Sequence, residues 1–109
     1  RDEMKRRVAA EFVNWGLPTA ECLIEVKAAV PHLPIIASGG LRSGLDVAKC
    51  IALGASMGGM AGSFLKTAVE SEKKAAELIT EIALEIKICM FAAGIKNIDE
   101  LKKTALRKI

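Results

Sequence analysis

Two glycine-rich segments contain the residues whose types and spacing best suit chemistry. Residues 37–44 have the sequence ASGGLRSG and residues 58–63 have the sequence GGMAGS. Each is predicted to follow a buried strand and to precede a helix, where unpaired N–H groups and the positive end of the helix dipole attract anions. Glycines matter there because a side chain would hold a phosphate oxygen away from the amides. The two segments therefore predict a phosphate site.

Arg42, inside the first segment, has two interpretations. Its guanidinium could be a charged donor to a phosphate dianion, or it could be a solvated surface arginine. The double glycine at 39 and 40 is also open to a second interpretation, because such pairs often serve only to reverse the chain. A second glycine-rich loop follows the next predicted strand at the matching position, and this favours phosphate binding. Two such loops after the last two strands of a barrel form a known phosphate cup.

Two short apolar runs predict the strands that position these loops. Residues 33–37 are nearly all apolar, as in strands buried on both faces of a parallel sheet. Residues 56–61 predict a second small strand that ends at Gly62, and their glycines indicate close backbone packing. The spacing of apolar residues predicts the helices, which are expected at 4–15, 19–30, 43–53, 64–69 and 71–93, followed by a short turn after residue 97.

Polar residues and glycines mark the expected helix ends. Thr19 is predicted to cap the second helix, and Ser43 with Asp46 three residues later forms a capping box for the third. Gly54 stands where a left-handed C-terminal cap is expected, and Asn97 is predicted to cap the last helix. Two consecutive strand–loop–helix units predict an α/β fold with parallel strands. Because two strands alone leave faces and edges uncovered, we expect residues 1–109 to be part of a larger domain.

Composition argues against several classes of function. The sixteen Lys and Arg residues are scattered along a chain of net charge +3, and aromatic residues make up only 4%, so nucleic-acid binding is not expected. The three cysteines (Cys22, Cys50 and Cys89) are widely spaced, which indicates buried thiols in a reducing compartment rather than disulfides or a metal site. No apolar stretch is long enough to cross a bilayer, and no initiator methionine or export signal is present at the start. We therefore expect a piece of a cytoplasmic protein.

The sequence resembles the FMN-dependent type 2 isopentenyl-diphosphate isomerases. The resemblance is carried by residues 15–20 (WGLPTA), 34–49 (PIIASGGLRSGLDVAK), 51–55 (IALGA), 59–62 (GMAG) and 64–66 (FLK). It implies a TIM (β/α)8 barrel of which residues 1–109 are the C-terminal part, containing the last two strands and their helices. It also implies that the FMN phosphate is held on one side by Gly39, Gly40, Leu41 and Arg42, and on the other by Ala61 and Gly62.

The same resemblance implies an activity and its requirements. The family converts isopentenyl diphosphate to dimethylallyl diphosphate, with reduced FMN, Mg²⁺ and NADPH as reductant. The catalytic residues, the metal ligand and the contacts to the diphosphate are implied to lie upstream of Arg1, so none is assigned within these residues. An isolated copy of the chain would expose sheet edges, and we expect it to form a homo-oligomer.

Two other functions remain open at this point. A different FMN barrel enzyme, such as a 2-hydroxy-acid oxidase or dehydrogenase, would share the phosphate cup. Those enzymes usually have Asp before the double glycine and a Gly-Arg pair in the second loop, whereas this chain has Ser38 and Ala61-Gly62. The alternative from another class is a non-catalytic half-barrel that binds phosphate or mediates oligomerisation.

Overall fold

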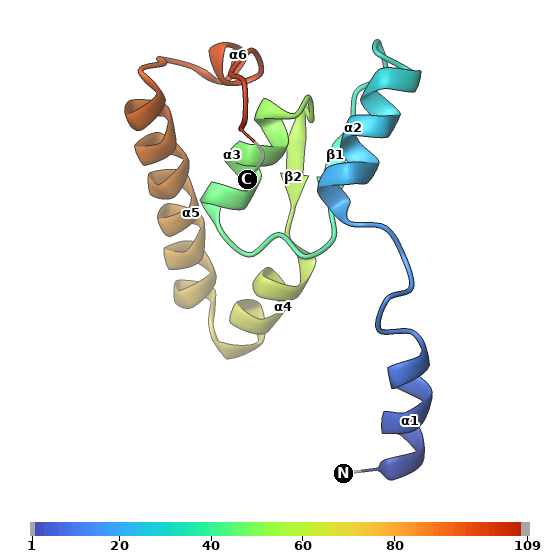
Figure 1. Cartoon of the computed structure of the whole chain (residues 1–109). Coiled ribbons are helices and arrows are strands. Elements are labelled where there is room, and N and C mark those ends of the chain that lie inside the picture. Colours follow the sequence, from blue (N-terminus) through green and yellow to red (C-terminus); the bar gives the residue numbers. More distant parts are fainter. Residues whose placement is uncertain (1, 108–109) are drawn as a thin grey trace.

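Two short parallel strands lie at the centre of the computed structural model, which describes residues 2–107 (Figure 1). Strand β1 (Ile36–Ser38) pairs with β2 (Met57–Gly59), and helix α3 (Gly44–Ala52) connects them. The parallel pairing predicted from the sequence is confirmed, but β1 begins three residues later than predicted. Leu33 donates its N–H to the Val30 carbonyl in a turn, so that residue is unavailable for pairing.

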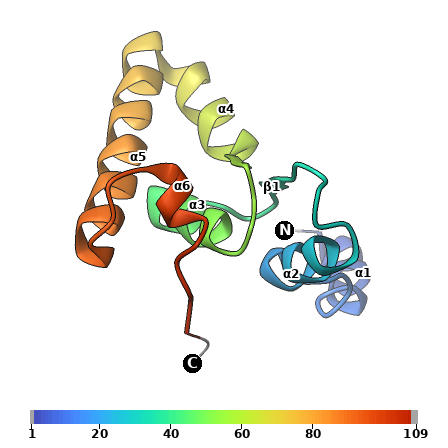
Figure 2. The ribbon, with the colours of Figure 1, turned by 90° about the horizontal axis from the view of Figure 1, so that it is seen from above.

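The remaining helices surround this unit. They are α1 (Glu3–Glu11), α2 (Thr19–Ala29), α4 (Ala61–Glu70), α5 (Glu72–Ala93) and α6 (Ile98–Leu101). Seen from above, α1 and α2 lie on one side of the strands, and α3, α5 and α6 lie on the other (Figure 2). Among the described residues, no helix combines the length and the apolar composition that crossing a membrane requires.

The hydrophobic core lies where α3 packs between the strands and α5. Its buried members are Leu23, Ala37, Leu41, Val47, Ala48, Cys50, Ile51, Ala55, Met60 and Leu101. Two glycines allow this packing. A β-carbon on Gly58 would lie 3.1 Å from side-chain atoms of both Leu41 and Val47, and one on Gly44 would overlap the Ile82 carbonyl oxygen. The predicted close backbone packing of the second strand is therefore confirmed.

The two faces of the small sheet have opposite environments. Ala37 is 4% exposed, whereas Ile36 is 65% exposed and its partner Met57 is 56% exposed. Ile36 and Met57 are opposite each other in register and so lie on the same face of the sheet. Helices α2 and α3 pack against the strands on one face, and the other face is open, which fits the expectation that two strands alone leave surfaces uncovered.

Most of the predicted helix ends are confirmed. The Ser43 side chain accepts a hydrogen bond from the Asp46 N–H at 3.3 Å, and Asn97 accepts one from the Glu100 N–H at 2.8 Å. Gly54 follows α3 with φ +115°, a conformation that favours glycine. These ends were predictable because a cap and the helix it terminates are a few residues apart in sequence.

The first helix and the outer face of the long helix differ from expectation. The predicted helix at 4–15 ends at Glu11, and its apolar residues are exposed, including Val8 at 55% and Phe12 at 56%. The helical spacing of apolar residues in 71–93 places Ile79 on an apolar stripe expected to pack, but Ile79 is 58% exposed in α5. Helical periodicity identifies an apolar face, but burial needs a neighbouring element, and these positions have none among the described residues.

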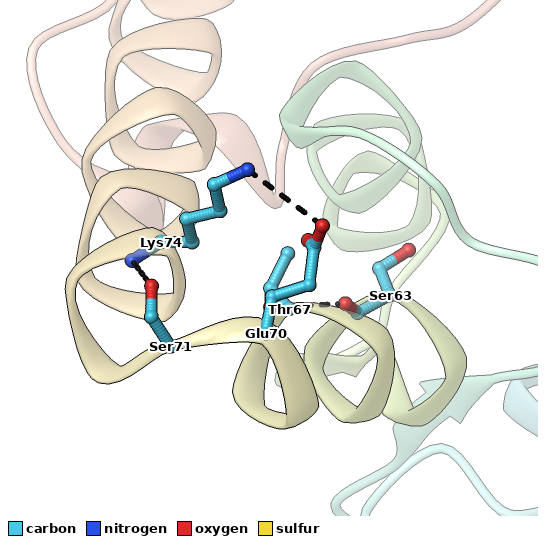
Figure 3. A network of polar contacts seen from close by, with 5 residues as sticks. All are labelled: Ser63, Thr67, Glu70, Ser71 and Lys74. Atoms are coloured by element: carbon cyan, nitrogen blue, oxygen red, sulfur yellow. Dashed lines mark hydrogen bonds and ion pairs between the residues drawn. The ribbon is translucent and has the colours of Figure 1, made fainter.

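A set of polar contacts stabilises the corner between α4 and α5 (Figure 3). The Ser71 hydroxyl accepts a hydrogen bond from the Lys74 N–H at 3.1 Å and so caps α5. Lys74 Nζ lies 3.6 Å from Glu70 Oε1, and the Thr67 hydroxyl donates to the Ser63 carbonyl at 3.1 Å. The ion pair is exposed and adds little stability. The Ser71 cap and the turn between the two helices therefore set the direction of α4 relative to α5.

The cysteines agree with the interpretation as structural thiols. All three are free, with Cys50 buried and Cys22 and Cys89 half-buried. Burial raises the pKa of the Cys50 thiol, and the nearby charge of Asp46 raises it further. Cys50 is therefore an unreactive apolar side chain of the core.

We expect Gly44→Ala to destabilise the fold. Its β-carbon would overlap the Ile82 carbonyl oxygen and lie 2.6 Å from the β-carbon of Glu85, so α3 and α5 would have to separate. The expected loss in unfolding free energy is about 1–3 kcal/mol, measured by urea denaturation.

Gly62→Ala is the matched control for this substitution. Apart from its chain neighbours and the backbone of α4 itself, no atom lies within 4 Å of a β-carbon built on Gly62, which is in the first turn of α4. Its unfolding free energy should be unchanged or rise by up to about 1 kcal/mol. Equal stability of the two variants would contradict the packing argument.

Candidate functional site

A cavity of about 450 Å³ lies at the carboxyl ends of the two strands. This volume falls within the range of small-molecule sites, about 300–1,000 Å³. All six residues predicted from the sequence to bind the phosphate line it, and the full lining is Ser38, Gly39, Gly40, Leu41, Arg42, Gly59, Met60, Ala61, Gly62 and Ser63. The two glycine-rich loops are therefore adjacent in space, as the parallel pairing of their strands requires.

The N-terminus of α4 forms one wall of the cavity. Ala61 and Gly62 were predicted to close a strand, but they are the first two residues of this helix, and Met60 occupies its N-cap position. Met60 makes no side-chain capping bond. Among the described residues, the N–H groups of Ala61, Gly62 and Ser63 donate to no other group. Uncapped amides of this kind, with the positive end of the helix dipole, favour an anion.

The loop after β1 forms the opposite wall. Gly39 has φ +109° and Gly40 has φ +78°, so both occupy conformations that side chains disfavour. Within residues 2–107, the amides of Gly40 and Leu41 have no hydrogen-bond acceptor. A β-carbon on Gly40 would meet nothing within 4 Å. The conformation of the backbone, rather than a lack of space, therefore explains the glycine at position 40.

The start of α3 differs from the start of α4, because one side chain of α3 and one of α5 accept hydrogen bonds from main-chain amides there. The Arg42 N–H donates to Asp46 Oδ2 at 2.9 Å, and the Gly44 N–H donates to Glu85 Oε1 at 2.7 Å. The resemblance places Arg42 in one wall of the phosphate site, but its main-chain amide already has an acceptor. Its exposed side chain remains the only part of Arg42 that is available to a ligand. The free donors of the cavity are therefore the amides of Gly40, Leu41 and the first turn of α4.

Thr19 does not have the capping role predicted for it. Pro18 occupies the N-cap position of α2, and Thr19 is the first helical residue. The Thr19 hydroxyl instead donates to the Gly39 carbonyl at 2.7 Å and lies 3.5 Å from the Ser38 carbonyl. No sequence signal linked residue 19 to residue 39.

Four further residues of the two glycine-rich segments line the cavity, although the sequence did not assign them individually to phosphate binding. They are Ser38, Gly59, Met60 and Ser63. Ser63 had a usable signal, since a serine in the first turn of a helix has its hydroxyl close to the free amides. His32, the single histidine of the sequence, is exposed and does not line the cavity.

The donor set suits a phosphate group better than a metal ion. The cavity is lined by main-chain N–H groups, a guanidinium and serine hydroxyls, and none of its lining residues carries a carboxylate. Within residues 2–107, no group of three or more His, Cys, Asp or Glu side chains is arranged to hold a metal. The lining therefore fits an anion.

Similar proteins are known from diverse organisms. An isopentenyl-diphosphate delta-isomerase of Nostoc sp. is 52% identical over 99 residues, which cover 91% of this chain and 28% of the relative. One of Archaeoglobus fulgidus is 48% identical over 93% of this chain and 28% of its own length, and one of Oceanobacillus iheyensis is 39% identical over 96% and 30%. The chain thus spans less than a third of these relatives.

The match at the level of families extends over nearly the whole chain. Residues 13–108 match the family described as FMN-dependent dehydrogenase. This range includes both strands, both glycine-rich loops and every residue that lines the cavity. The chain belongs to the FMN-dependent dehydrogenase family.

Proposed function

We propose that the chain is the FMN phosphate-binding part of a (β/α)8-barrel isopentenyl-diphosphate isomerase, which converts isopentenyl diphosphate to dimethylallyl diphosphate. The observation that carries this proposal is the pair of facing walls with unpartnered main-chain N–H groups around one cavity. Membership of an FMN-dependent family supports the cofactor, and the names of the similar isomerases support the reaction.

The barrel is supported by the surfaces that the described residues leave uncovered. The sheet has only two strands, and the face with Ile36 and Met57 is open. The radius of gyration is 16.4 Å, compared with about 13 Å for a compact domain of this length. Additional parallel strands that pair with the edges of β1 and β2 would close the sheet into a barrel. The open face would then lie in the interior of that barrel.

Each wall of the cavity has a separate role in this proposal. The amides of Gly40 and Leu41 bind the phosphate from one side, those of Ala61 and Gly62 bind it from the other, and the Arg42 guanidinium adds positive charge. Gly39 supplies the turn that brings these amides together. Bound in reduced form, FMN supplies the flavin that takes part in the proton transfers of the isomerisation. Mg²⁺ and NADPH are required by the whole enzyme in this proposal, and no residue of this chain is assigned to either, or to catalysis.

The family match keeps a second function open. Its description as a dehydrogenase favours an FMN-dependent oxidoreductase, for which a 2-hydroxy-acid oxidase or dehydrogenase is the alternative raised by the sequence. Ser38 and the Ala61-Gly62 pair argue against it, since those enzymes usually have Asp and Gly-Arg at these positions. Turnover of isopentenyl diphosphate rather than a 2-hydroxy acid by the complete protein would separate the two functions.

The location and assembly of the chain are also proposals. Three free cysteines fit a reducing compartment, and we propose the cytoplasm. The exposed face of the sheet supports self-association of the isolated chain, with Ile36 and Met57 in the interface. A half-barrel that only binds phosphate or oligomerises remains the non-catalytic alternative for the isolated polypeptide.

We expect Gly62→Asp to weaken phosphate and FMN binding by about tenfold or more, because it places a carboxylate beside the dianion. The space around a β-carbon at position 62 is empty, so the substitution should not disturb packing. Isothermal titration with inorganic phosphate, and the change in flavin absorbance with FMN, measure the two affinities.

Gly62→Asn is the control, since it has the same shape without the charge. Its affinity should stay within about threefold of the original, because only the electrostatic repulsion is removed. An unchanged affinity in Gly62→Asp would contradict the proposed site.

The chain alone should not isomerise isopentenyl diphosphate, even with FMN, Mg²⁺ and NADPH supplied. The diphosphate and the flavin ring must be held in a defined geometry, and no residue here is assigned to either. Product formation is measured against a reaction without protein, with the full-length Archaeoglobus fulgidus isomerase as the positive control. Turnover clearly above background would show that catalytic groups lie within these residues.

The isolated chain should sediment at micromolar concentration as a dimer or larger species. Ile36→Lys should shift it toward the monomer, because a charge on the open sheet face opposes burial of that face. Phe91→Lys is the control, since Phe91 is 88% exposed on α5, away from the sheet. A folded monomer of 11.6 kDa would contradict the proposed self-association.

A further inference from the structure

Thr19 makes a hydrogen bond between two parts of the chain that are far apart in sequence. Its hydroxyl lies in the first turn of α2 and donates to the Gly39 carbonyl at 2.7 Å. The bond is not a helix cap, because its acceptor is a carbonyl outside α2 and no side chain caps the start of this helix. The bond joins the start of α2 to the loop that forms one wall of the cavity.

The geometry of the peptide group links this bond to the cavity. The Gly39 carbonyl and the Gly40 N–H belong to the same planar peptide unit, and in a trans peptide they point in opposite directions. No cis peptide bond occurs among residues 2–107. When the Thr19 hydroxyl holds the Gly39 carbonyl, the Gly40 N–H must point away from Thr19. That N–H has no acceptor among the described residues, and Gly40 lines the cavity.

The glycines around this peptide make such a restraint necessary. Gly39 and Gly40 both have positive φ values, and glycine populates positive and negative φ almost equally. Without a restraint, the peptide between them could rotate and point its carbonyl oxygen toward the anion instead of its N–H. A β-carbon on Gly39 would lie 3.1 Å from the Thr19 hydroxyl oxygen, so glycine at 39 also makes room for the bond.

We infer that Thr19 is a positioning residue that fixes the direction of the Gly40 N–H and thereby prepares the loop to bind a phosphate group. The inference rests on the proposed phosphate site but adds a residue outside the cavity lining. Thr19 acts through the Gly39–Gly40 peptide and not by contact with the ligand.

The test compares Thr19→Val, which removes the hydroxyl at nearly equal volume, with Thr19→Ser, which retains it. The isotopically labelled chain is titrated with inorganic phosphate and followed by NMR. Thr19→Val should shift the Gly39 carbonyl and Gly40 amide resonances of the free protein and weaken phosphate binding about three- to tenfold. Thr19→Ser should restore both, and the Ala61 and Gly62 amides should respond to phosphate in every variant.

Thr80→Val is the matched control. Its hydroxyl donates to the Ala76 carbonyl at 3.2 Å on α5, so the substitution removes a similar bond away from the cavity. Phosphate affinity should then stay within about twofold of the original, since no hydrogen bond near the site is lost. Thr19→Ala provides the second test of position 19 if valine disturbs the first turn of α2.

Two results would overturn the inference. One is an unchanged Gly39 carbonyl resonance in Thr19→Val, even with a loss of affinity, since the hydroxyl would then act on the anion directly. The other is a shifted resonance with unchanged phosphate affinity. The proposed function itself would be contradicted if phosphate left the Gly40, Ala61 and Gly62 amide resonances of the unsubstituted chain unchanged. In that case, the Gly39 resonance of Thr19→Val still shows whether Thr19 holds the peptide.

Discussion

The close packing of α3 between the strands and α5 is the constraint on which the rest of the structure depends. Gly44 lies against the backbone of α5, and Gly58 lies against the side chains of Leu41 and Val47. This packing buries Ala48 and Ile51 and holds α3 in the crossover that makes β1 and β2 parallel. Because parallel strands end at the same edge of a sheet, both glycine-rich loops lie beside one cavity.

The chemistry of that cavity follows from which amides the protein satisfies by itself. Asp46 and Glu85 accept the N–H groups at the start of α3, so this helix end has little left to offer a ligand. Within residues 2–107, the first turn of α4 has no such acceptor, and the Met60 side chain makes no capping bond. Two consecutive helices therefore begin near the same cavity, but among the described residues that line it, the free helix amides belong to the first turn of α4.

The free loop amides and the helix amides differ in how they are held. Those of α4 point along the helix axis because the helix itself orients them. The loop has two adjacent glycines at positive φ and no regular structure to direct its peptides. The hydrogen bond from Thr19 to the Gly39 carbonyl supplies that restraint from a separate helix. The packing of α2 beside β1 is thus connected to the geometry of the site, although α2 contributes no residue to its lining.

The sequence by itself determined the features that depend on neighbouring residues. The cap at Ser43, the left-handed turn at Gly54 and the parallel unit that places Gly40 and Gly62 were all predictable, because periodicity and capping act over a few positions. Tertiary structure alone decided the partner of Thr19, which lies twenty residues away, and the acceptor of the Gly44 amide on Glu85, forty-one residues away. It also decided which apolar faces are covered, since burial depends on what packs against a face and not on the face itself.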